Sequence, residues 1–587
     1  MREEFRDSSA DGRRADLEGR TGVPPRRQSR RIETRRRAAR VSLIRAVGVL
    51  VFLAVVMTAL AVTLSRGGVG GVATSSTTGG TLERVAGEDR DALEPDAAPA
   101  TSRGSPATSL STIITQKTTT TSGIEPGDVR VPGTHYGPIN TEFAGVTMFR
   151  GNGSRTYYGE GPVPTNPKVL WKFGPMEGAS TYHGQPFTWT GTGWTGQPAV
   201  IERPDGTTWV IFGSYDKYIH FLDAETGKKV YPSFKGGNIF KGSVTVDPDG
   251  YPLVFMGCRD NEWKVIAIDR EEPVQLWHMH AADVQIVWND DWDGNVVIRN
   301  DYAFVPGENS HFFIVKLNRG YDAEGKVTVS PRIVLDFPSW TDALFEAIGD
   351  QETSIENSPA LVGDRVYFAN SGGLIHGLDV SATLRELEPG EDPPQGRDAF
   401  PVVFRWWDGD DTDASIVVDD EGFLYVGVEL QRFLPRAKEV GQIIKVDPTK
   451  NAAGDNPLVW SVEVTKLAEE GLSGVWATPC LYRDMVYVPT HSGALLGIDR
   501  FTGNIRWRKP FTTHAWSSAV VVDGVLIVAD NLGVIHAYDV TDTKVDPPEV
   551  WAIRIPTGGA FESTPVVWKG RIYVGCRDGF FYCLGDE

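Results

Sequence analysis

The sequence predicts an all-β fold: an eight-bladed β-propeller of four-stranded antiparallel blades, with its ring closed by a strand from the N-terminal side. Three observations carry this prediction. One β-rich unit recurs through residues 141–587, and eight copies of its first strand can be counted. A third is an isolated strand-like segment that supplies what the last copy lacks. Because each unit must bury its faces against neighbours, such repeats favour a radial array.

The repeat is clearest in residues 486–507, VYVPTHSGALLGIDRFTGNIRW. Alternating apolar positions, β-branched residues and Gly-containing turns predict the strands of antiparallel hairpins. Asp499 can accept backbone N–H bonds in the Asp-x-x-Thr-Gly turn, where Gly503 supplies a positive φ. Trp507, on the outer strand, offers an apolar plate to the neighbouring blade and an indole N–H for a fixed acceptor.

Eight first strands set the number of blades. They begin at Gln197, Gly242, Asn295, Asn357, Ala414, Ala477, Ser518 and Ser563. The last copy ends at Phe581–Leu584 without an outer strand. Lys168–Phe173, KVLWKF, is expected to be that strand and to close the ring, which removes an exposed sheet edge.

The first 140 residues are predicted to be a basic tail, a membrane anchor and a linker. Residues 1–45 contain 14 Arg and 7 acidic residues, a balance of +7. Residues 46–65 carry no charge, and a helix of this length spans a hydrocarbon core about 30 Å thick. A cleaved signal peptide is the alternative. Its apolar region is about 7–15 residues long, so an uncleaved signal anchor is favoured. Residues 66–140, rich in Gly, Ser, Thr and Pro, are expected to be a disordered linker.

Charge then predicts location and partner class. The excess of Arg before residue 46 keeps the N-terminus in the cytoplasm, so the expected location is the cytoplasmic membrane, single-pass, with the propeller outside the cytoplasm. Residues 46–587 contain 44 basic and 70 acidic residues, a balance of −26. Nucleic-acid binding needs clustered Lys and Arg, so no nucleic-acid partner is expected. The expected partner, besides the membrane, is a protein or glycan of the cell envelope.

These residues resemble the tryptophan-docking repeat of the pyrroloquinoline-quinone-like propellers, A-x-D-x-x-T-G-x-x-x-W. That family includes eight-bladed quinoprotein alcohol dehydrogenases and the non-enzymatic outer-membrane assembly lipoprotein of the BAM complex. The resemblance covers about three-quarters of the chain and implies the fold; fold alone does not imply an activity.

The resemblance also implies what a quinone site needs. Quinoprotein dehydrogenases of this fold typically hold the quinone against a disulfide between adjacent cysteines, with a calcium ion nearby. Here the four cysteines, Cys258, Cys480, Cys576 and Cys583, are all separated, and no C-x-x-C-H haem site is present. Pyrroloquinoline quinone is therefore not an expected cofactor, and the cysteines are interpreted as small buried residues.

One loop has calcium-like spacing. Asn289, Asp291, Asp293 and Gly294 fit [DN]-x-D-x-D-G, which wraps oxygen ligands around calcium. The pattern departs further on, with Val297 at the ninth position and Asn300 at the twelfth. Calcium at Asn289, Asp291 and Asp293 is the one metal hypothesis, and no other cofactor is expected.

Segments just before the first strands are expected to open onto one end of the central channel. Several carboxylates, two Trp and one Lys lie there and could bind a cation, an amine or a sugar. The candidate ligand residues are Lys241, Asp293, Glu356, Asn357, Asp411, Asp413, Trp476, Trp516 and Glu562. The alternative is that the acidic residues only cap strands and face solvent. The lead-in segment, residues 149–162, is expected to pack across one face of the ring.

The sequence favours a non-catalytic binding or assembly scaffold in the cell envelope. Rigid propellers offer wide faces, and the cofactor apparatus of the enzymes is missing. A divergent dehydrogenase dependent on pyrroloquinoline quinone and calcium is the alternative, and an extracellular sensor is a third. Whether the chain is an enzyme stays open on sequence alone. Insertions at residues 382–401 and 429–441 are candidate partner contacts.

Overall fold

The computed structural model describes residues 112–118, 130, 133, 137–139, 143–182, 185–388, 390–450, 455–466, 473–511 and 514–587. The expected basic tail, residues 1–45, and the expected membrane anchor, residues 46–65, lie outside these residues. No helix within the described residues is long and apolar enough to cross a bilayer.

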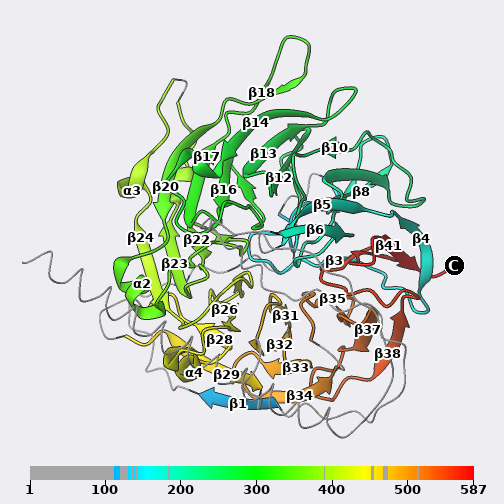
Figure 1. The fold of residues 1–587 in the computed structure, drawn as a ribbon, viewed down its shortest axis with the longest axis vertical. Helices are drawn as coiled ribbons and strands as arrows, with labels where there is room; N and C mark the ends of the chain where they lie inside the picture. Colours follow the sequence, from blue (N-terminus) through cyan, green and yellow to red (C-terminus); the bar gives the residue numbers. More distant parts are fainter. Residues whose placement is uncertain are drawn as a thin grey trace, which may run out of the picture. The chain divides into compact units, whose positions relative to one another are not determined.

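The described residues form eight four-stranded blades around a central axis (Figure 1). From the innermost strand outward, blade one contains β7 (Ala199–Glu202), β8 (Thr208–Gly213), β9 (Tyr218–Asp223) and β10 (Phe234–Lys235); blade two β11 (Thr245–Val246), β12 (Leu253–Cys258), β13 (Glu262–Ala267) and β14 (Val274–His280); and blade three β15 (Val297–Arg299), β16 (Tyr302–Pro306), β17 (His311–Lys316) and β20 (Arg332–Pro338). Blade four contains β21 (Ala360–Val362), β22 (Arg365–Phe368), β23 (Leu374–Asp379) and β24 (Val402–Trp407); blade five β25 (Val417–Val418), β26 (Leu424–Gly427), β28 (Ile443–Val446) and β29 (Leu458–Lys466); and blade six β31 (Cys480–Tyr482), β32 (Met485–Pro489), β33 (Ala494–Asp499) and β34 (Ile505–Pro510). Blade seven contains β35 (Val520–Val522), β36 (Val525–Ala529), β37 (Val534–Asp539) and β38 (Glu549–Arg554), and blade eight β39 (Val566–Trp568), β40 (Arg571–Gly575), β41 (Phe581–Gly585) and β4 (Lys168–Phe173).

The prediction of an eight-bladed propeller, and of how its ring closes, is confirmed. Strand β4 has the predicted bounds and pairs antiparallel with β41, so the eighth blade joins strands from both ends of the domain. In Figure 1 the cyan β4 lies beside the red β41. Two short strands add to the inner edges: β2 (Gly145–Val146) on β7, and β3 (Gly159–Glu160), parallel, on β39.

The docking role predicted for the repeat's tryptophan is visible between neighbouring blades. Trp460 donates its indole N–H to the Arg500 carbonyl of the next blade, at 2.9 Å. Gly503, at φ +75°, lies against the Trp460 ring, and a Cβ there would come within 2.8 Å of the ring. In the same turn, Asp499 accepts the N–H of Thr502. The turn from Asp499 to Gly503 therefore provides the surface against which the tryptophan of the preceding blade packs.

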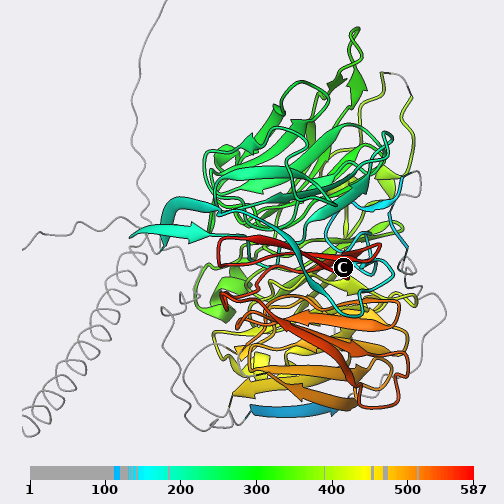
Figure 2. The same ribbon diagram turned by 90° about the vertical axis from the view of Figure 1, so that its right-hand side faces the viewer.

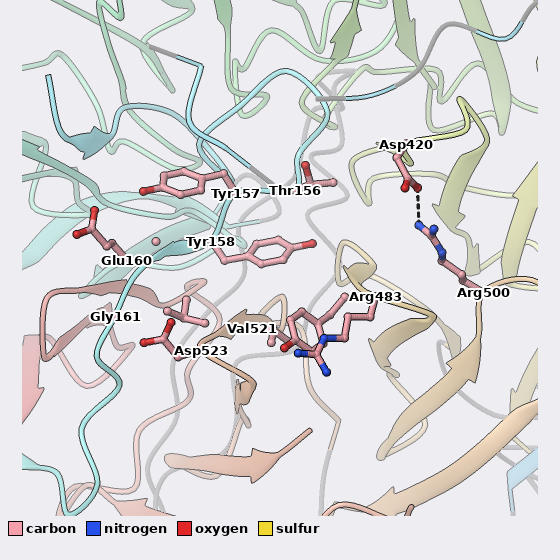
Figure 3. Close-up of a pocket in the computed structure, with 13 residues that line it drawn as sticks. Thr156, Tyr157, Tyr158, Glu160, Gly161, Asp420, Arg483, Arg500, Val521 and Asp523 are labelled. Carbon is pink, nitrogen blue, oxygen red and sulfur yellow. Dashed lines mark ion pairs between the residues drawn. The ribbon is translucent and has the colours of Figure 1, made fainter. Parts of the chain in front are cut away.

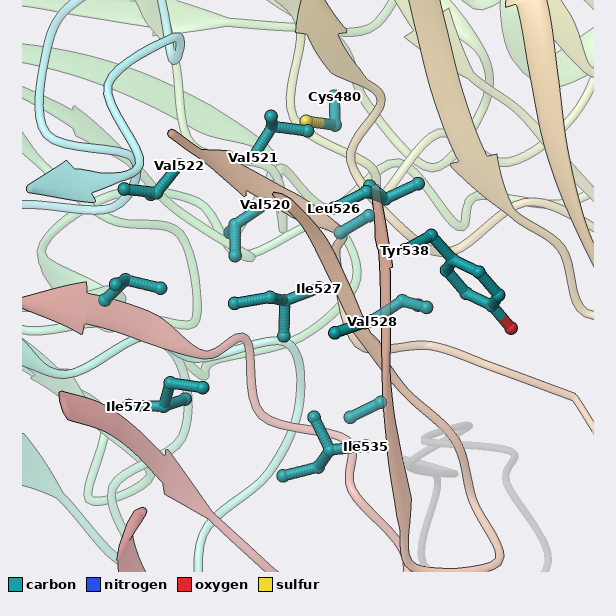
Figure 4. Close-up of a cluster of buried hydrophobic side chains, with 14 of the residues drawn as sticks. Cys480, Val520, Val521, Val522, Leu526, Ile527, Val528, Ile535, Tyr538 and Ile572 are labelled. Carbon is teal, nitrogen blue, oxygen red and sulfur yellow. The ribbon is translucent and has the colours of Figure 1, made fainter. Parts of the chain in front are cut away.

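Apolar side chains fill the space between blades. Figure 4 shows one such cluster, in which Val520, Ile527 and Ile535 of the seventh blade converge with Ile572 of the eighth. Almost every strand residue of the inner three strands is buried, as expected for sheets covered on both faces. This packing holds the loops at each end of the channel in fixed positions.

Several elements are added to the blades. Three two-stranded ribbons are β5 (Glu177–Tyr182) with β6 (Gln185–Thr190), β18 (Gly320–Tyr321) with β19 (Val327–Thr328), and β27 (Glu429–Leu430) with β30 (Ser473–Gly474). The helices of the described residues are α2 (Asp342–Ile348), α3 (Gly396–Ala399) and α4 (Pro435–Val440), with 3-10 turns η1 (Ala281–Asp283) and η2 (Ser381–Thr383). The β5–β6 ribbon projects from one face of the ring (Figure 2).

One strand departs from the sequence prediction. Residues 66–140 are expected to contain no packed structure, yet β1 (Thr112–Thr118) pairs antiparallel with β29 and forms a fifth, outermost strand of blade five. Its sequence, TIITQKT, is rich in β-branched residues, which favour the extended backbone. In Figure 1 it is the blue strand at the outer edge.

Candidate functional site

Seven of the nine predicted channel-mouth residues occupy one repeated position. Each lies four residues before the first residue of an innermost strand, as Lys241 lies before Thr245 of β11. We name this the ring position. From blade one to blade eight it is occupied by Thr195, Lys241, Asp293, Glu356, Asp413, Trp476, Trp516 and Glu562. Asn357 and Asp411, the other two candidates, lie one residue after and two residues before it. The ring is thus basic in blade two, acidic in blades three to five, and aromatic in blades six and seven.

Blade three contains a buried carboxylate cluster with its own cations. One carboxylate oxygen each from Asp291, Asp293 and Glu308 lie within 4.8 Å of one another. Lys241 Nζ lies 2.5 Å from Asp293 and 3.6 Å from Asp291, and Arg259 Nε lies 3.6 Å from Asp291. Burial, with the charges of Asp293 and Asp291, raises the pKa of Glu308 well above its usual range. We name this group the blade-three cluster.

The residues that the calcium hypothesis names, Asn289, Asp291 and Asp293, lie in or beside this cluster. Asp291 and Asp293 do meet a third carboxylate, but it is that of Glu308, which the loop pattern does not include. Asn289 instead supports Glu308, because its amide nitrogen donates to Glu308 Oε2 at 2.5 Å. Its carbonyl oxygen accepts the N–H of Asp290. A lysine ammonium therefore lies against the carboxylates that the calcium hypothesis names.

Blade five repeats the same three positions. Asp411 and Asp413 precede β25 as Asp291 and Asp293 precede β15, and Glu429 follows β26 by two residues as Glu308 follows β16. Their carboxylate oxygens again lie within 4.8 Å of one another. Burial, together with the charges of Asp411, Glu356 and Glu429, raises the pKa of Asp413. Burial, opposed in part by Arg432, raises the pKa of Asp411 to about 7. We name this group the blade-five cluster.

A docked loop positions Glu429 in this cluster. Asp410 accepts three backbone N–H groups, those of Gln431, Arg432 and Phe433, at 3.0–3.1 Å. The N–H of Glu429 donates to the carbonyl of Asp411 at 2.8 Å. The loop that begins the second predicted insertion is therefore fixed against the segment before β25, with the Glu429 side chain buried.

The aromatic sector lies in blades six and seven. Trp516 donates its indole N–H to His491 Nδ1 at 2.8 Å, and Trp476 packs on the same imidazole with ring centres 4.0 Å apart. His514 stacks on His491 from a neighbouring loop, at 4.8 Å. Both tryptophans are buried. They form a wall of the channel end, held together by their own contacts.

Two further candidates are also bonded within the protein. Glu562 pairs with Arg577, which donates to both carboxylate oxygens at 2.7 and 3.0 Å. Asn357 donates to the carbonyls of Ala369 and Thr412, while its side-chain oxygen accepts the N–H of Ala369. The amide of Asn357 thus holds the ends of two blades together.

Sequence reasoning missed two arginines of the lead-in segment. Arg150 is completely buried and donates to the carbonyls of Thr478, Pro479 and Ala519. Arg155, also buried, donates to the carbonyl of Pro359 at 2.7 Å. These carbonyls lie directly before or at the start of innermost strands of blades four, six and seven. The segment therefore binds the inner strands of several blades at once, a closer contact than packing across one face.

The face on which the first and second strands of each blade are joined carries a pocket of about 450 Å³. Figure 3 shows Tyr157, Tyr158 and Glu160 of the lead-in segment on one side of it, and the Arg500–Asp420 ion pair, at 2.8 Å, on another. Its polar groups come from turns of several blades. It contains no carboxylate cluster like those of blades three and five.

All four cysteines lie among the described residues, and all are buried and free. Burial raises the pKa of each thiol, so none is a ready thiolate at neutral pH. Their structural role agrees with the interpretation from sequence.

The profile of the family PQQ_2, described as outer membrane protein assembly factor BamB, matches residues 441–580. The propeller has the PQQ-like repeat. Among solved structures, BamB from Moraxella catarrhalis is 16% identical, with 65% of this chain and 92% of that chain covered and a TM-score of 0.41. Quinohemoprotein alcohol dehydrogenase from Comamonas testosteroni is 12% identical, with 75% and 80% covered and a TM-score of 0.46.

A curated relative, the β-alanine-activating enzyme of Danio rerio, is 29% identical over 104 residues. The match covers 16% of this chain and 8% of that enzyme. The chain thus spans less than a tenth of the length of this relative.

Proposed function

We propose that this chain is a non-catalytic binding or assembly scaffold of the cell envelope, anchored in the cytoplasmic membrane through residues 46–65 with its propeller outside the cytoplasm. One observation carries the proposal: at the channel mouth, side chains suited to a ligand bind one another. Lys241 binds Asp293, Glu562 binds Arg577, and Trp516 binds His491. A ligand would have to replace these buried contacts, each costly to leave unmade. The exposed faces of the ring are then the surfaces that a partner contacts.

The residues present fit a quinone poorly. Asn357, the amide among the candidate ligand residues, has both its donor and its acceptor atoms bonded to the backbone of blades four and five. The four cysteines are separated in sequence and buried singly, so none forms the adjacent pair on which a quinone would stack. The amide of Asn357 and the four cysteines therefore suit a structural role better than a redox cofactor site.

The β5–β6 ribbon supports a partner contact on the same face. It projects from the ring (Figure 2), and most of its described side chains are exposed. Trp189 at its base packs edge-on against Tyr215, with Arg259 and Arg577 over its ring. A ribbon fixed at its base and exposed along its length presents backbone and side chains to a protein or glycan.

Three measurements test this proposal, the first two on the full-length chain in detergent and the third in cells. With calcium and pyrroloquinoline quinone added, native mass spectrometry is expected to find no quinone bound, and dye-linked assays with alcohols and sugars no turnover. A photo-crosslinker at the exposed Thr188 of the ribbon is expected to capture one envelope partner in cells, and the same group at Val550 on the rim is not. Stoichiometric quinone with turnover would overturn the proposal, as would equal, non-selective capture from both positions.

One observation favours the alternative, a divergent dehydrogenase. A carboxyl group with a pKa of about 7, as Asp411 has, matches the requirement for a general base near neutral pH. If the chain were such an enzyme, Asp411→Asn would abolish turnover that the wild-type chain shows with quinone and calcium. The scaffold proposal expects no turnover in either chain.

A further inference from the structure

The blade-three and blade-five clusters are the same three carboxylates placed on two blades. What differs is the residue that the preceding blade contributes at the ring position. Blade two contributes Lys241 to the blade-three cluster, with its ammonium group 2.5 Å from Asp293. Blade four contributes Glu356 beside the blade-five cluster; its charge acts on Asp413 and Glu429, and also on Glu308 of the blade-three cluster. The blade-five cluster therefore gains a fourth carboxylate where its counterpart gains a cation.

Two oxygens of the blade-five cluster are left without a hydrogen-bond donor. Asp411 Oδ1 and Glu429 Oε1 accept no hydrogen bond from the part of the chain that the structure describes, although both side chains are more than nine-tenths buried. A buried ionised carboxylate without donors is costly unless a positive charge compensates it. The charges of Asp411 and Glu356 act on both Asp413 and Glu429, and all of these groups are carboxylates.

The nearest arginine is committed elsewhere. Arg432 pairs with Asp350 at 2.9 Å and Glu352 at 3.3 Å, and donates to the carbonyl of Ser371 at 2.7 Å. Its guanidinium lies 3.5 Å from Asp410, the carboxylate that docks the loop. Arg432 thus balances the outer acidic residues of the loop and lowers the pKa of Asp411 only in part.

We propose that Asp411, Asp413 and Glu429 bind one calcium ion, with Glu356 beside it. Calcium takes six to eight oxygen ligands at about 2.3–2.6 Å, so opposite ligands lie about 4.6–5.2 Å apart. One carboxylate oxygen from each of the three residues lies within 4.8 Å of the others, close enough for all three to contact one ion. Asp413 is the half-buried member of the three. This inference does not depend on the proposed scaffold function.

The ion would tie the loop of Glu429 to the segment before β25. Asp410 and the Glu429 N–H already fix the two backbones together. The carboxylates of the loop and of the segment before β25 repel one another without the ion and share it as ligands when it is bound. The ion therefore stabilises the packing of the loop against this segment. We expect a structural ion that exchanges slowly, since two of the three ligands are buried.

Calcium titration of the full-length chain in detergent, after removal of metal with a chelator, tests the proposal. Isothermal calorimetry and native mass spectrometry are expected to show one calcium ion per chain. Glu429→Gln and Asp413→Asn are each expected to weaken binding at least 100-fold. The matched blade-three variant Glu308→Gln keeps wild-type affinity, because its cluster already has Lys241.

Circular dichroism shows whether each variant keeps the propeller. Removing one carboxylate from a repelling cluster is expected to leave the metal-free melting temperature unchanged or higher. A wild-type chain that binds no calcium overturns the proposal. So does a chain in which folded Glu429→Gln and Asp413→Asn both bind as tightly as wild type, or in which Glu308→Gln loses the ion instead.

Discussion

The blade-three and blade-five clusters show that a repeat can place the same carboxylates twice and still build two different sites. In both, two aspartates precede an innermost strand and a glutamate follows the second strand. Each triad belongs to its own blade, whereas the counter-charge comes from the blade before it. Lys241 makes one cluster a buried ion-pair network, and Glu356 makes the other an acidic cage. The identity of a site on a propeller is therefore decided between blades, and single residues at the ring position can change it.

The largest expected effect comes from removing the lysine of blade three. Lys241→Met leaves buried Asp293 without its ammonium partner, while Arg259 stays near Asp291. Breaking such a pair costs about 3–5 kcal/mol of unfolding free energy. Because the remaining triad then matches that of blade five, calcium should bind it too and restore part of the loss. Urea unfolding with and without calcium measures the stability, and native mass spectrometry should count two ions in place of one.

A buried lysine away from both clusters provides the control. Lys445 is buried and lies 3.8 Å from Asp419. Lys445→Met should lower stability without any gain of calcium. If Lys241→Met binds no additional ion, the two triads are not equivalent and the comparison between the blades is wrong.

The reverse exchange should have the next largest effect. Glu356→Lys places an ammonium group at the blade-five cluster as Lys241 stands at the blade-three cluster. Charged hydrogen bonds then replace repulsion, and the metal-free unfolding free energy should rise by about 1–3 kcal/mol. Calcium binding should be lost, which calorimetry measures directly. Glu356→Gln, which removes the charge without reversing it, should fall between the two; a variant with Lys that still binds calcium would contradict this.

A smaller effect is expected from the loop that positions Glu429. Asp410 holds three backbone N–H groups but is not itself one of the three proposed ligands. Asp410→Asn should weaken these charge-assisted bonds, cost about 1–2 kcal/mol of unfolding free energy and lower calcium affinity about tenfold. Asp290→Asn, the same position in blade three, should leave calcium affinity unchanged. Equal affinity for Asp410→Asn and wild type would remove its positioning role.

The blades and the ring position could be predicted from the sequence because the repeated residues mark where each blade begins. Strand period, turn glycine and docking tryptophan recur, so the start of each innermost strand and the residue four positions before it follow. Glu308 and Glu429 were missed, since a residue after the second strand approaches the first only when the hairpin folds. The shared slot of these two glutamates, two residues after β16 and β26, is the signal that an alignment of the repeats contains.

Other features carry no repeating signal. Arg150 and Arg155 are bound by backbone carbonyls, and any sequence supplies those, so nothing in the neighbouring residues marks them as buried. For β1 the signal was present in the β-branched residues of TIITQKT, but its Ser- and Thr-rich surroundings suggested a linker. Only the outer edge of blade five, known from the structure, explains why that segment forms a strand.

The smallest expected effect concerns His376 of blade four, which lies between the two clusters. This group makes the unfolding free energy depend on pH, so its contribution must be known before the two clusters are compared at different pH values. His376 is buried, its Nε2 bonds the carbonyl of Ser339 at 2.8 Å, and burial with the nearby Arg405 lowers its pKa to about 3. Its unfolded pKa is about 6.5, so the unfolded chain binds more protons below that pH and stability falls as pH is lowered. Between pH 7.5 and 6.0 this one group should cost about 0.8 kcal/mol of unfolding free energy. His376→Gln should lack that slope in urea unfolding, whereas Glu429→Gln should keep it. An identical pH slope in His376→Gln and wild type would contradict the lowered pKa, because the imidazole would then bind protons equally in the folded and unfolded chains.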